Sequence, residues 1–422
     1  MHKIETLLQT LVPKGVEFKK IGELFKRNKG INITAAQMKE LHSEIGKVRI
    51  FAGGATKADI NYKDISKKDI INCESVIIKS RGNIGFEYYN QPFSHKNEIW
   101  SYSSKTNQML VKFLYYYLSN NQYYFQKLAQ SSSVKLPQLS VSDTDEYEVP
   151  VPPLEVQQEI VKILDAFTEL NTELNTELNA RKKQYEYYQN MLLDFNGIYS
   201  NHQDAKMSTK PYPKRLKTLL QTLAPKGVEF KKIGELFKRN KGINITAAQM
   251  KELHSEIGKV RIFAGGATKA DINYKDISKK DIINCESVII KSRGNIGFEY
   301  YNQPFSHKNE IWSYSSKTNQ MLVKFLYYYL SNNQYYFQKL AQSSSVKLPQ
   351  LSVSDTDEYE VPVPPLEVQQ EIVKILDQFS ILTTDLLAGI PAEIKARKKQ
   401  YEYYREKLLT FKPLTPHKEV KK

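Results

Sequence analysis

The sequence reads Val-Pro-Val-Pro-Pro-Leu-Glu-Val-Gln-Gln-Glu-Ile-Val-Lys-Ile-Leu-Asp at residues 149–165, and the same stretch returns at residues 361–377. Its prolines favour an extended backbone, because proline fixes its own φ and restricts the residue before it. After Pro153, apolar residues recur every three or four positions, which predicts a helix that begins at Leu154. Each copy of the stretch therefore marks a junction between a globular domain and a helix.

The duplication extends upstream from this junction over a whole domain. Residues 6–165 match residues 218–377 at an offset of 212, with one difference, Val12 against Ala224. The copies then diverge and align again at residues 180–188 and 396–404, with an offset of 216. So long a unit is not a solenoid repeat. The predicted divisions are a first domain at 1–153, a first long helix at 154–195, a linker at 196–216, a second domain at 217–365, a second long helix at 366–411 and a basic tail at 412–422.

Within one copy, the sequence pattern predicts an α+β domain. Helices are expected at residues 4–11, 37–41 and 110–129, the last interrupted near 119–121. Strands are expected at residues 48–52, 75–79 and 97–102, with a turn-rich loop at 80–85 and a polar loop at 130–135.

The first long helix would extend about 60 Å at ~1.5 Å per residue, which is more than a compact domain of this size needs. The second long helix is the natural partner, and an antiparallel coiled coil of the two would relate the domains by an approximate twofold axis. Three consecutive Thr-Glu-Leu-Asn repeats occupy residues 168–179. Gly389 and Pro391 should kink or break the second helix.

The net charge of +15 favours a polyanionic partner, with nucleic acid first and an anionic membrane surface second. However, residues 6–165 hold 21 basic and 17 acidic residues, only +4 for each copy, so the net charge is a weak argument for a nucleic-acid partner. No apolar run is long enough for a transmembrane helix, and the first residues do not resemble a signal peptide. The two cysteines do not suffice for a disulfide framework or a zinc site. We expect a soluble, cytoplasmic protein.

The sequence offers little catalytic chemistry. Residues 52–57 contain Gly-Gly and a lysine but not the spacing of a P-loop. Asn90-Gln91-Pro92-Phe93 nearly matches the Asn-Pro-Pro-aromatic motif of amino-methyltransferases, but a surface turn is the simpler interpretation. His42 and His95 lack acidic partners at ligand spacing, and Cys73 is expected to be a buried core residue. The pattern favours a binding protein.

The repeated stretch at residues 149–165 closely resembles the Pro-Pro-Leu-x-x-Gln-x-x-Ile signature of the specificity subunits of type I restriction–modification systems. Residues 13–22 and 77–85 also look like segments of that family. The order of domain, long helix, domain, long helix matches, and tetrapeptide repeats in the first helix are a further family trait. The resemblance covers nearly the whole chain.

This resemblance implies that each domain is a target-recognition domain that reads one half of a split DNA target. It implies two methylation subunits, which bring S-adenosylmethionine and usually methylate adenine, and restriction subunits, if present, which bring ATP and Mg²⁺. This chain itself would hold no cofactor, no metal and no catalytic residue, and would not contact a membrane. Family members usually carry two different recognition domains. Two identical domains related by a twofold axis should read identical half-sites in inverted orientation, an interrupted palindrome.

The candidate DNA contacts lie in polar loops, where lysine and arginine suit phosphates, and arginine, asparagine and serine suit base edges. In the first copy they are Lys57, Lys79, Ser80, Arg81, Asn83, Ser132 and Lys135. In the second copy they are Lys269, Lys291, Ser292, Arg293, Asn295, Ser344 and Lys347. A solvated hairpin turn is the alternative interpretation of Arg81-Gly82-Asn83.

Two other functions are compatible with the sequence. A non-catalytic coiled-coil scaffold would bind DNA without a methylation partner, with strong salt dependence and no sequence preference. An intrinsic methyltransferase would bind S-adenosylmethionine alone, although no glycine-rich cofactor loop follows a strand.

Overall fold

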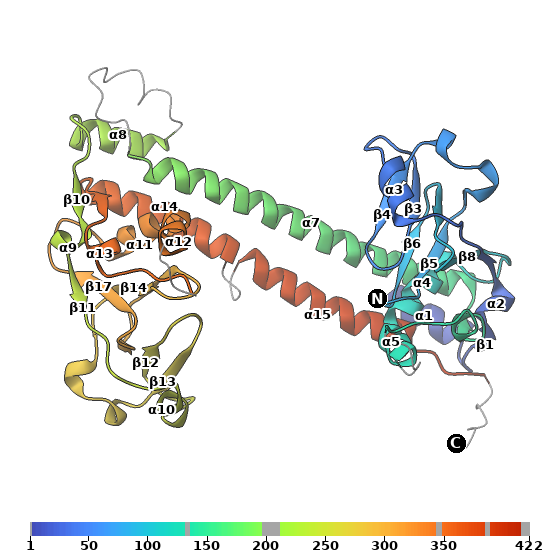
Figure 1. Cartoon of the computed structure of the whole chain (residues 1–422). Helices are drawn as coiled ribbons and strands as arrows, with labels where there is room; N and C mark the ends of the chain where they lie inside the picture. The colour runs from blue at the N-terminus through green and yellow to red at the C-terminus, as the bar shows by residue number, and fades with distance from the viewer. Residues whose placement is uncertain (1, 131–135, 196–211, 343–347, 385–388, 415–422) are drawn as a thin grey trace. The chain divides into compact units, whose positions relative to one another are not determined.

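The computed structural model describes residues 2–130, 136–195, 212–342, 348–384 and 389–414 (Figure 1). The chain divides into two compact units. The first unit comprises Met1–Asn175 and Glu393–Lys422, and the second comprises Thr176–Ala392. Each unit therefore contains one globular domain and segments from both long helical regions.

The first domain is built on a four-stranded antiparallel sheet in the order β2 (Phe25–Asn28), β8 (Trp100–Ser104), β5 (Ser75–Lys79) and β6 (Gly85–Tyr89). A three-stranded sheet has the order β4 (Lys57–Ile60), β3 (Val48–Phe51) and β7 (Phe93–His95), with β3 and β7 parallel. A two-stranded ribbon pairs β1 (Glu17–Lys20) with β9 (Glu148–Val151).

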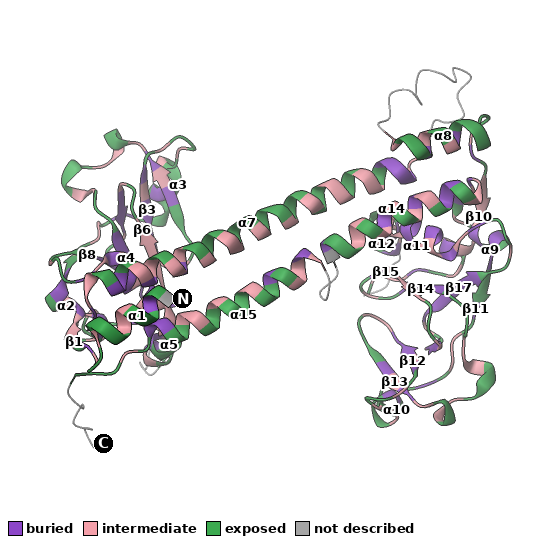
Figure 2. Cartoon of the chain, turned by 180° about the vertical axis from the view of Figure 1, so that it is seen from behind, coloured by how far each residue is buried: buried purple, intermediate pink, exposed green. Residues whose placement is uncertain are grey.

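Strand β5 is the centre of the domain because all five of its residues are buried. Its alternating side chains enter two different cores, as the period of a strand requires. Val76 and Ile78 pack with helices α4 (Val111–Asn120) and α5 (Gln122–Gln130), while Ile77 packs with Phe51 and Phe93 between the two sheets. Figure 2 shows this concentration of buried residues in the strands.

Short helical elements complete the first domain. Thr34 caps α3 (Ala35–Leu41) by accepting a hydrogen bond from the Gln37 amide, as a capping box does. Met38 of α3 is buried against the three-stranded sheet. The other short elements are α1 (His2–Leu11), α2 (Ile21–Leu24), η1 (Tyr62–Asp64), η2 (Lys67–Asp69) and α6 (Ser142–Asp145).

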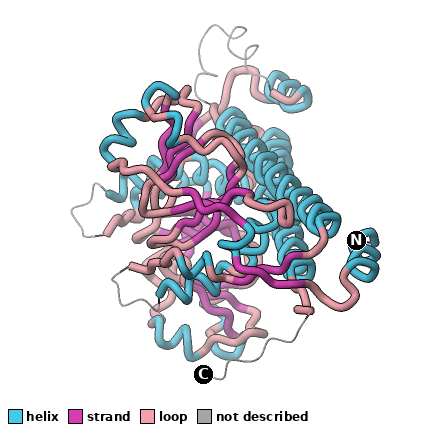
Figure 3. The backbone as a smooth tube through the Cα atoms, turned by 90° about the vertical axis from the view of Figure 1, so that its right-hand side faces the viewer, coloured by secondary structure: helices cyan, strands magenta, loops and turns pink. Residues whose placement is uncertain are grey.

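The second domain repeats these elements in the same order. Figure 3 shows the backbone coloured by secondary structure, with the strands in magenta. Its sheets are β11-β17-β14-β15, β13-β12-β16 and β10-β18. The strands are β10 (Phe230–Lys232), β11 (Phe237–Asn240), β12 (Val260–Phe263), β13 (Lys269–Ile272), β14 (Ser287–Lys291), β15 (Gly297–Tyr301), β16 (Phe305–His307), β17 (Trp312–Ser316) and β18 (Glu360–Pro362). The helices are α8 (Lys214–Leu223), α9 (Ile233–Leu236), α10 (Ala247–Glu252), η3 (Tyr274–Asp276), η4 (Lys279–Asp281), α11 (Val323–Asn332), α12 (Gln334–Gln342) and α13 (Ser354–Asp357).

The long helical regions differ between the copies, as expected. The first is the continuous helix α7 (Leu154–Leu193). The second is divided into α14 (Leu366–Thr384) and α15 (Ile390–Leu409). A Cβ added at Gly389 would lie 2.3 Å from the carbonyl oxygen of Ile381, so only glycine fits here. The predicted break is confirmed.

The helix segments inside each unit run antiparallel. In the first unit, Phe167 of α7 stacks on Tyr404 of α15, and the earlier α7 residue Ile160 shares a core with the later residue Leu408. In the second unit, Tyr188 of α7 stacks on Phe379 of α14. In each unit, the apolar faces of these helices therefore pack together one helix segment from each copy of the sequence.

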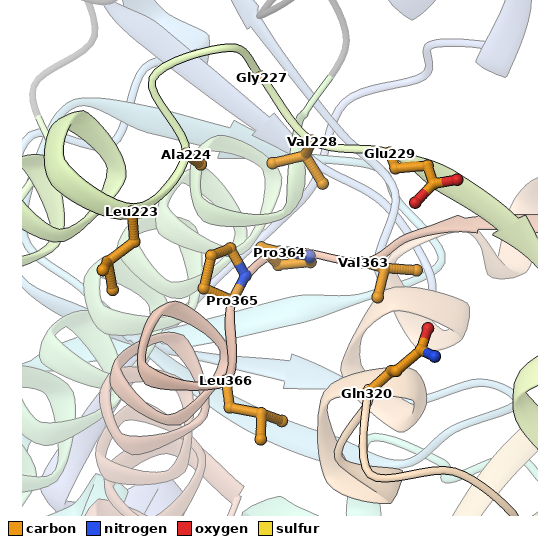
Figure 4. A pocket seen from close by; sticks show the side chains of 10 residues that line it. All are labelled: Leu223, Ala224, Gly227, Val228, Glu229, Gln320, Val363, Pro364, Pro365 and Leu366. Carbon is orange, nitrogen blue, oxygen red and sulfur yellow. The ribbon is translucent and has the colours of Figure 1, made fainter.

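The Pro-Pro-Leu junction between each domain and its long helix, at residues 152–154 and 364–366, forms a groove beside the domain. In the second unit it lies between the segment after α8 and the entry to α14, where Pro364 and Pro365 face Leu223 and Val228 (Figure 4). In the first unit the corresponding groove also has Leu414 in its wall. There the Val16 amide donates to Lys412 O at 2.8 Å, and the Leu414 amide donates to Val16 O at 2.9 Å.

Two local expectations were inaccurate. Cys73, expected in the core, is exposed, because it precedes the buried strand β5 in a surface segment. The strand expected at residues 97–102 begins at Trp100, because residues 96–99 form a turn.

Candidate nucleic-acid interface

Four loop segments of the first domain meet at one end of its sheets. They are the β3–β4 turn with the first residue of β4 (52–57), the β5–β6 loop (80–84), the β7–β8 loop (96–99) and residues 136–138, and together we call them the loop end. Two of these four segments, 52–57 and 80–84, contain residues proposed from sequence as DNA contacts in this domain, namely Lys57, Ser80, Arg81 and Asn83.

Glu98 connects three segments of the loop end. Its Oε1 accepts a hydrogen bond from the Gly53 amide at 3.2 Å. Its Oε2 lies 3.1 Å from Nζ of Lys96. Its backbone carbonyl accepts a hydrogen bond from Ser80 Oγ at 2.7 Å. The β3–β4 turn and the β5–β6 loop are therefore both attached to the β7–β8 loop.

The β5–β6 loop is also paired with the fourth segment. The Gly82 amide donates to Pro137 O at 2.9 Å, and the Leu139 amide donates to Ser80 O at 2.9 Å. Gly82 has φ +74°, a left-handed conformation that favours glycine, and nothing surrounds the place of its missing Cβ within 4 Å. This pairing places Arg81 beside Gln138.

Two of the predicted contacts are turned into the protein. Lys79 is 7% exposed, and its Nζ lies 4.7 Å from the centre of the Phe51 ring and 3.5 Å from Ala52 O. Burial lowers the pKa of Lys79 despite the attraction of Glu87. Ser80 is 1% exposed and bonded to Glu98. The same holds for Lys291 and Ser292 in the second domain. These side chains support the loop end from inside and do not project from it.

Lys57, Arg81 and Asn83 are exposed. Their counterparts Lys269, Arg293 and Asn295 are exposed as well. Nε and Nη2 of Arg293 donate to Gln350 Oε1 at 3.3 and 3.0 Å, which orients the guanidinium group. Ser132, Lys135, Ser344 and Lys347 lie outside the described residues.

Sequence reasoning missed Lys96, Glu98 and Gln138. A signal for the first two was present, because Lys96-Asn97-Glu98 is a polar triplet between two apolar strands. No local signal identified Gln138, which reaches the loop end only through its pairing with Arg81.

The residues weighed for catalysis have other roles. Phe93 of the Asn-Gln-Pro-Phe segment is fully buried beside Phe51 and Tyr89, so it cannot stack on a flipped base without unfolding this core. His95 is buried; its Nδ1 donates a hydrogen bond to Lys96 O, and its Nε2 is hydrogen-bonded to Ser101 Oγ. Among the residues that the structure describes, no group of three or more His, Cys, Asp or Glu side chains could hold a metal ion. Across the same residues, no helix is sufficiently long and apolar to cross a membrane.

The repeated segments match a known family. The sequence model described as the type I restriction modification DNA specificity domain matches residues 13–182 and again residues 225–396. The chain belongs to the type I restriction–modification DNA specificity family. The resemblance inferred from the junction stretch is thereby confirmed.

Individual members of this DNA specificity family agree with the assignment. A putative type I restriction enzyme specificity subunit of Haemophilus influenzae is 31% identical over 355 residues, which cover 80% of this chain and 83% of that protein. The EcoR124I/EcoR124II specificity subunit of Escherichia coli is 28% identical and covers 74% of each chain. The type I restriction–modification S subunit from M. genitalium has the same fold, with a TM-score of 0.61 at 20% identity over 94% of this chain and 96% of that one.

Proposed function

We propose that this chain reads a split DNA target whose two halves are identical and inverted, an interrupted palindrome, and that the loop end of each domain contacts one half. The observation that carries the proposal is that the two recognition domains, whose residues 6–165 and 218–377 differ at one position, Val12 against Ala224, place the same exposed arginine and asparagine on the same loop. Identical reading groups recognise identical bases.

The inverted orientation has separate support. In each unit the helix that begins or ends at the domain lies antiparallel to a helix segment from the other copy. Such an exchange treats the two domains equivalently, as a twofold arrangement does. A DNA site read by a twofold arrangement has inverted half-sites.

In the proposed assembly, the catalytic reactions are carried out by other chains. Two methylation subunits would dock on this protein, bring S-adenosylmethionine and methylate adenine in each half-site. Restriction subunits, where the system has them, would bring ATP and Mg²⁺ for translocation and cleavage. In this proposal, the protein recognises DNA in the cytoplasm.

A map of modified bases tests the assembled function. DNA from cells that express this chain with its candidate methylation subunit should carry methyladenine in both halves of an interrupted palindrome. A split motif with unrelated halves would refute the identical-half reading. An absence of any motif, with the partner expressed and bound, would favour the scaffold that binds DNA without sequence preference.

A binding experiment tests the proposed interface. The double variant Arg81→Ala/Arg293→Ala should weaken binding to a duplex that contains the mapped site by about 1–3 kcal/mol for each domain. The control is Lys63→Ala/Lys275→Ala, which removes the same charge beyond the other end of β4 and β13. An equal loss in both double variants would contradict a reading role for the loop end.

A further inference from the structure

We propose that Glu98, with its counterpart Glu310, is a positioning residue that retains the Lys96 or Lys308 ammonium within the protein and so limits phosphate-driven, sequence-independent binding at the loop end. The inference rests on the proposed DNA contact at this surface. It adds a role for an acidic residue in the middle of a basic interface, where a carboxylate would by itself repel DNA.

The geometry around Glu98 uses both of its carboxylate oxygens. Oε1 accepts from the Gly53 amide, and Oε2 binds the Lys96 ammonium. In the second domain, Glu310 accepts from the Gly265 amide at 3.3 Å and lies 3.1 Å from Nζ of Lys308. The lysine and glutamate side chains are 18% and 29% exposed in both domains. The ion pair is therefore at the surface but partly shielded from water.

The electrostatics keep the carboxylate charged. Burial alone would raise the pKa of Glu98, but the hydrogen bonds from Lys96 and Gly53, together with the charges of Lys96 and Arg81, lower it. The pKa of Glu310 is lowered by its equivalent neighbours. An ionised glutamate neutralises one lysine in each loop end at neutral pH.

This pairing changes what the interface offers to DNA. Each phosphate that a lysine neutralises releases counterions and adds to affinity without regard to sequence. A lysine already paired with Glu98 must break that pair to contribute. Arg81 and Asn83, which suit base edges, are not tied to Glu98 by a hydrogen bond in the described structure. The pair therefore shifts the balance of binding from phosphates toward bases.

The test is the salt dependence of binding to a duplex of random sequence, measured by fluorescence anisotropy with the full-length double variant Glu98→Gln/Glu310→Gln. Glutamine retains an oxygen to accept from the Gly53 and Gly265 amides and loses the charge that binds lysine. One released lysine in each domain should steepen the slope of log Kobs against log salt by about 0.9 for each domain, about 1.8 in total. Over a fourfold rise in salt, from about 50 to about 200 mM, this corresponds to roughly a twelvefold larger fall in affinity.

Two further variants identify the cause. Adding Lys96→Gln/Lys308→Gln to the glutamine variant should return the slope to about the wild-type value. The control Glu40→Gln/Glu252→Gln makes the same change of net charge on exposed positions of α3 and α10, and it should leave the slope within error of wild type. A thermal melt of each variant confirms that it is folded.

An unchanged or shallower slope in a folded Glu98→Gln/Glu310→Gln protein would overturn the inference, as would an equal steepening in the Glu40→Gln/Glu252→Gln control. Failure of the proposed function has a different signature. There, Arg81→Ala/Arg293→Ala would bind the mapped site as tightly as wild type does.

Discussion

Replacement of Gly15 by alanine should detach the carboxyl-terminal residues from the first domain. Gly15 has φ +102°, and a Cβ there would lie 2.3 Å from Lys412 O, 3.0 Å from Lys412 C and 3.1 Å from Pro413 C. All three atoms are backbone, so no side chain can rotate away. Relief requires residues 412–414 to move, which breaks the two hydrogen bonds between Val16 and this segment.

The cost has two parts. A left-handed conformation costs an alanine about 1–2 kcal/mol. The two lost hydrogen bonds contribute about 0.5–1.5 kcal/mol each. The sum is about 2–5 kcal/mol. Gly54→Ala is a matched control, because Gly54 has φ +66° but nothing within 4 Å of the added Cβ, so it should cost only the conformational part.

Hydrogen exchange with mass spectrometry can follow the Val16 and Leu414 amides directly. Residues 6–165 and 218–377 yield peptides of identical sequence except where position 12 or 224 is included, so a peptide that spans residues 12–16 reports on the first domain alone. The hydrogen-bond part, about 1–3 kcal/mol, corresponds to exchange roughly 5- to 150-fold faster in Gly15→Ala. Protection equal to that of Gly54→Ala at both amides would refute the reasoning.

Three other outcomes follow from described contacts. Burial lowers the pKa of His95 from 6.5 to about 4, so the unfolded chain binds the proton more readily than the folded one. The free energy of unfolding should therefore be highest above pH 6.5 and lower by about 2 kcal/mol at about pH 5. Chemical denaturation should show this decline in the first domain and a smaller one in His95→Gln; an equal decline in both would contradict it. Asp165→Asn should destabilise the packing of α7 on α4 by about 1.5–3 kcal/mol, because Asp165 accepts hydrogen bonds from Lys112 at 2.7 Å and Tyr116 at 2.6 Å. The control Glu169→Gln, exposed on the same helix, should change the free energy of unfolding little. Equal effects of the two substitutions would contradict a stabilising role for Asp165. Deleting residues 172–175, one Thr-Glu-Leu-Asn repeat, removes about 6 Å of helix and should shorten the spacer in the modified-base map by one or two base pairs, at about 3.4 Å each, with unchanged half-sites. Altered half-sites with a constant spacer would contradict the expectation that the repeats set the spacer length.

Prediction from sequence succeeded where the pattern is local. The helix that begins at Leu154 follows from prolines and three- and four-residue spacing, and the break at Gly389 follows from the chemistry of glycine and proline. The strand at residues 75–79 follows from its apolar run. The candidate site was predicted less well. Lys79 and Arg81 are two residues apart in one polar stretch, yet Lys79 is buried and Arg81 exposed, because the strand continues through Lys79 and the turn starts after it.

The sequence by itself determined that the chain is a tandem duplication of one unit, so that the two domains must share a fold and a surface. It also determined that the long helices need partners to pack against. Only the tertiary structure decided which segments meet. Glu98 joins loops that are far apart in sequence, and Lys412–Leu414 complete a domain that begins some four hundred residues earlier. The physical reason is that propensity and hydrophobic period act over neighbouring residues, whereas these contacts depend on how buried faces bring distant backbone together.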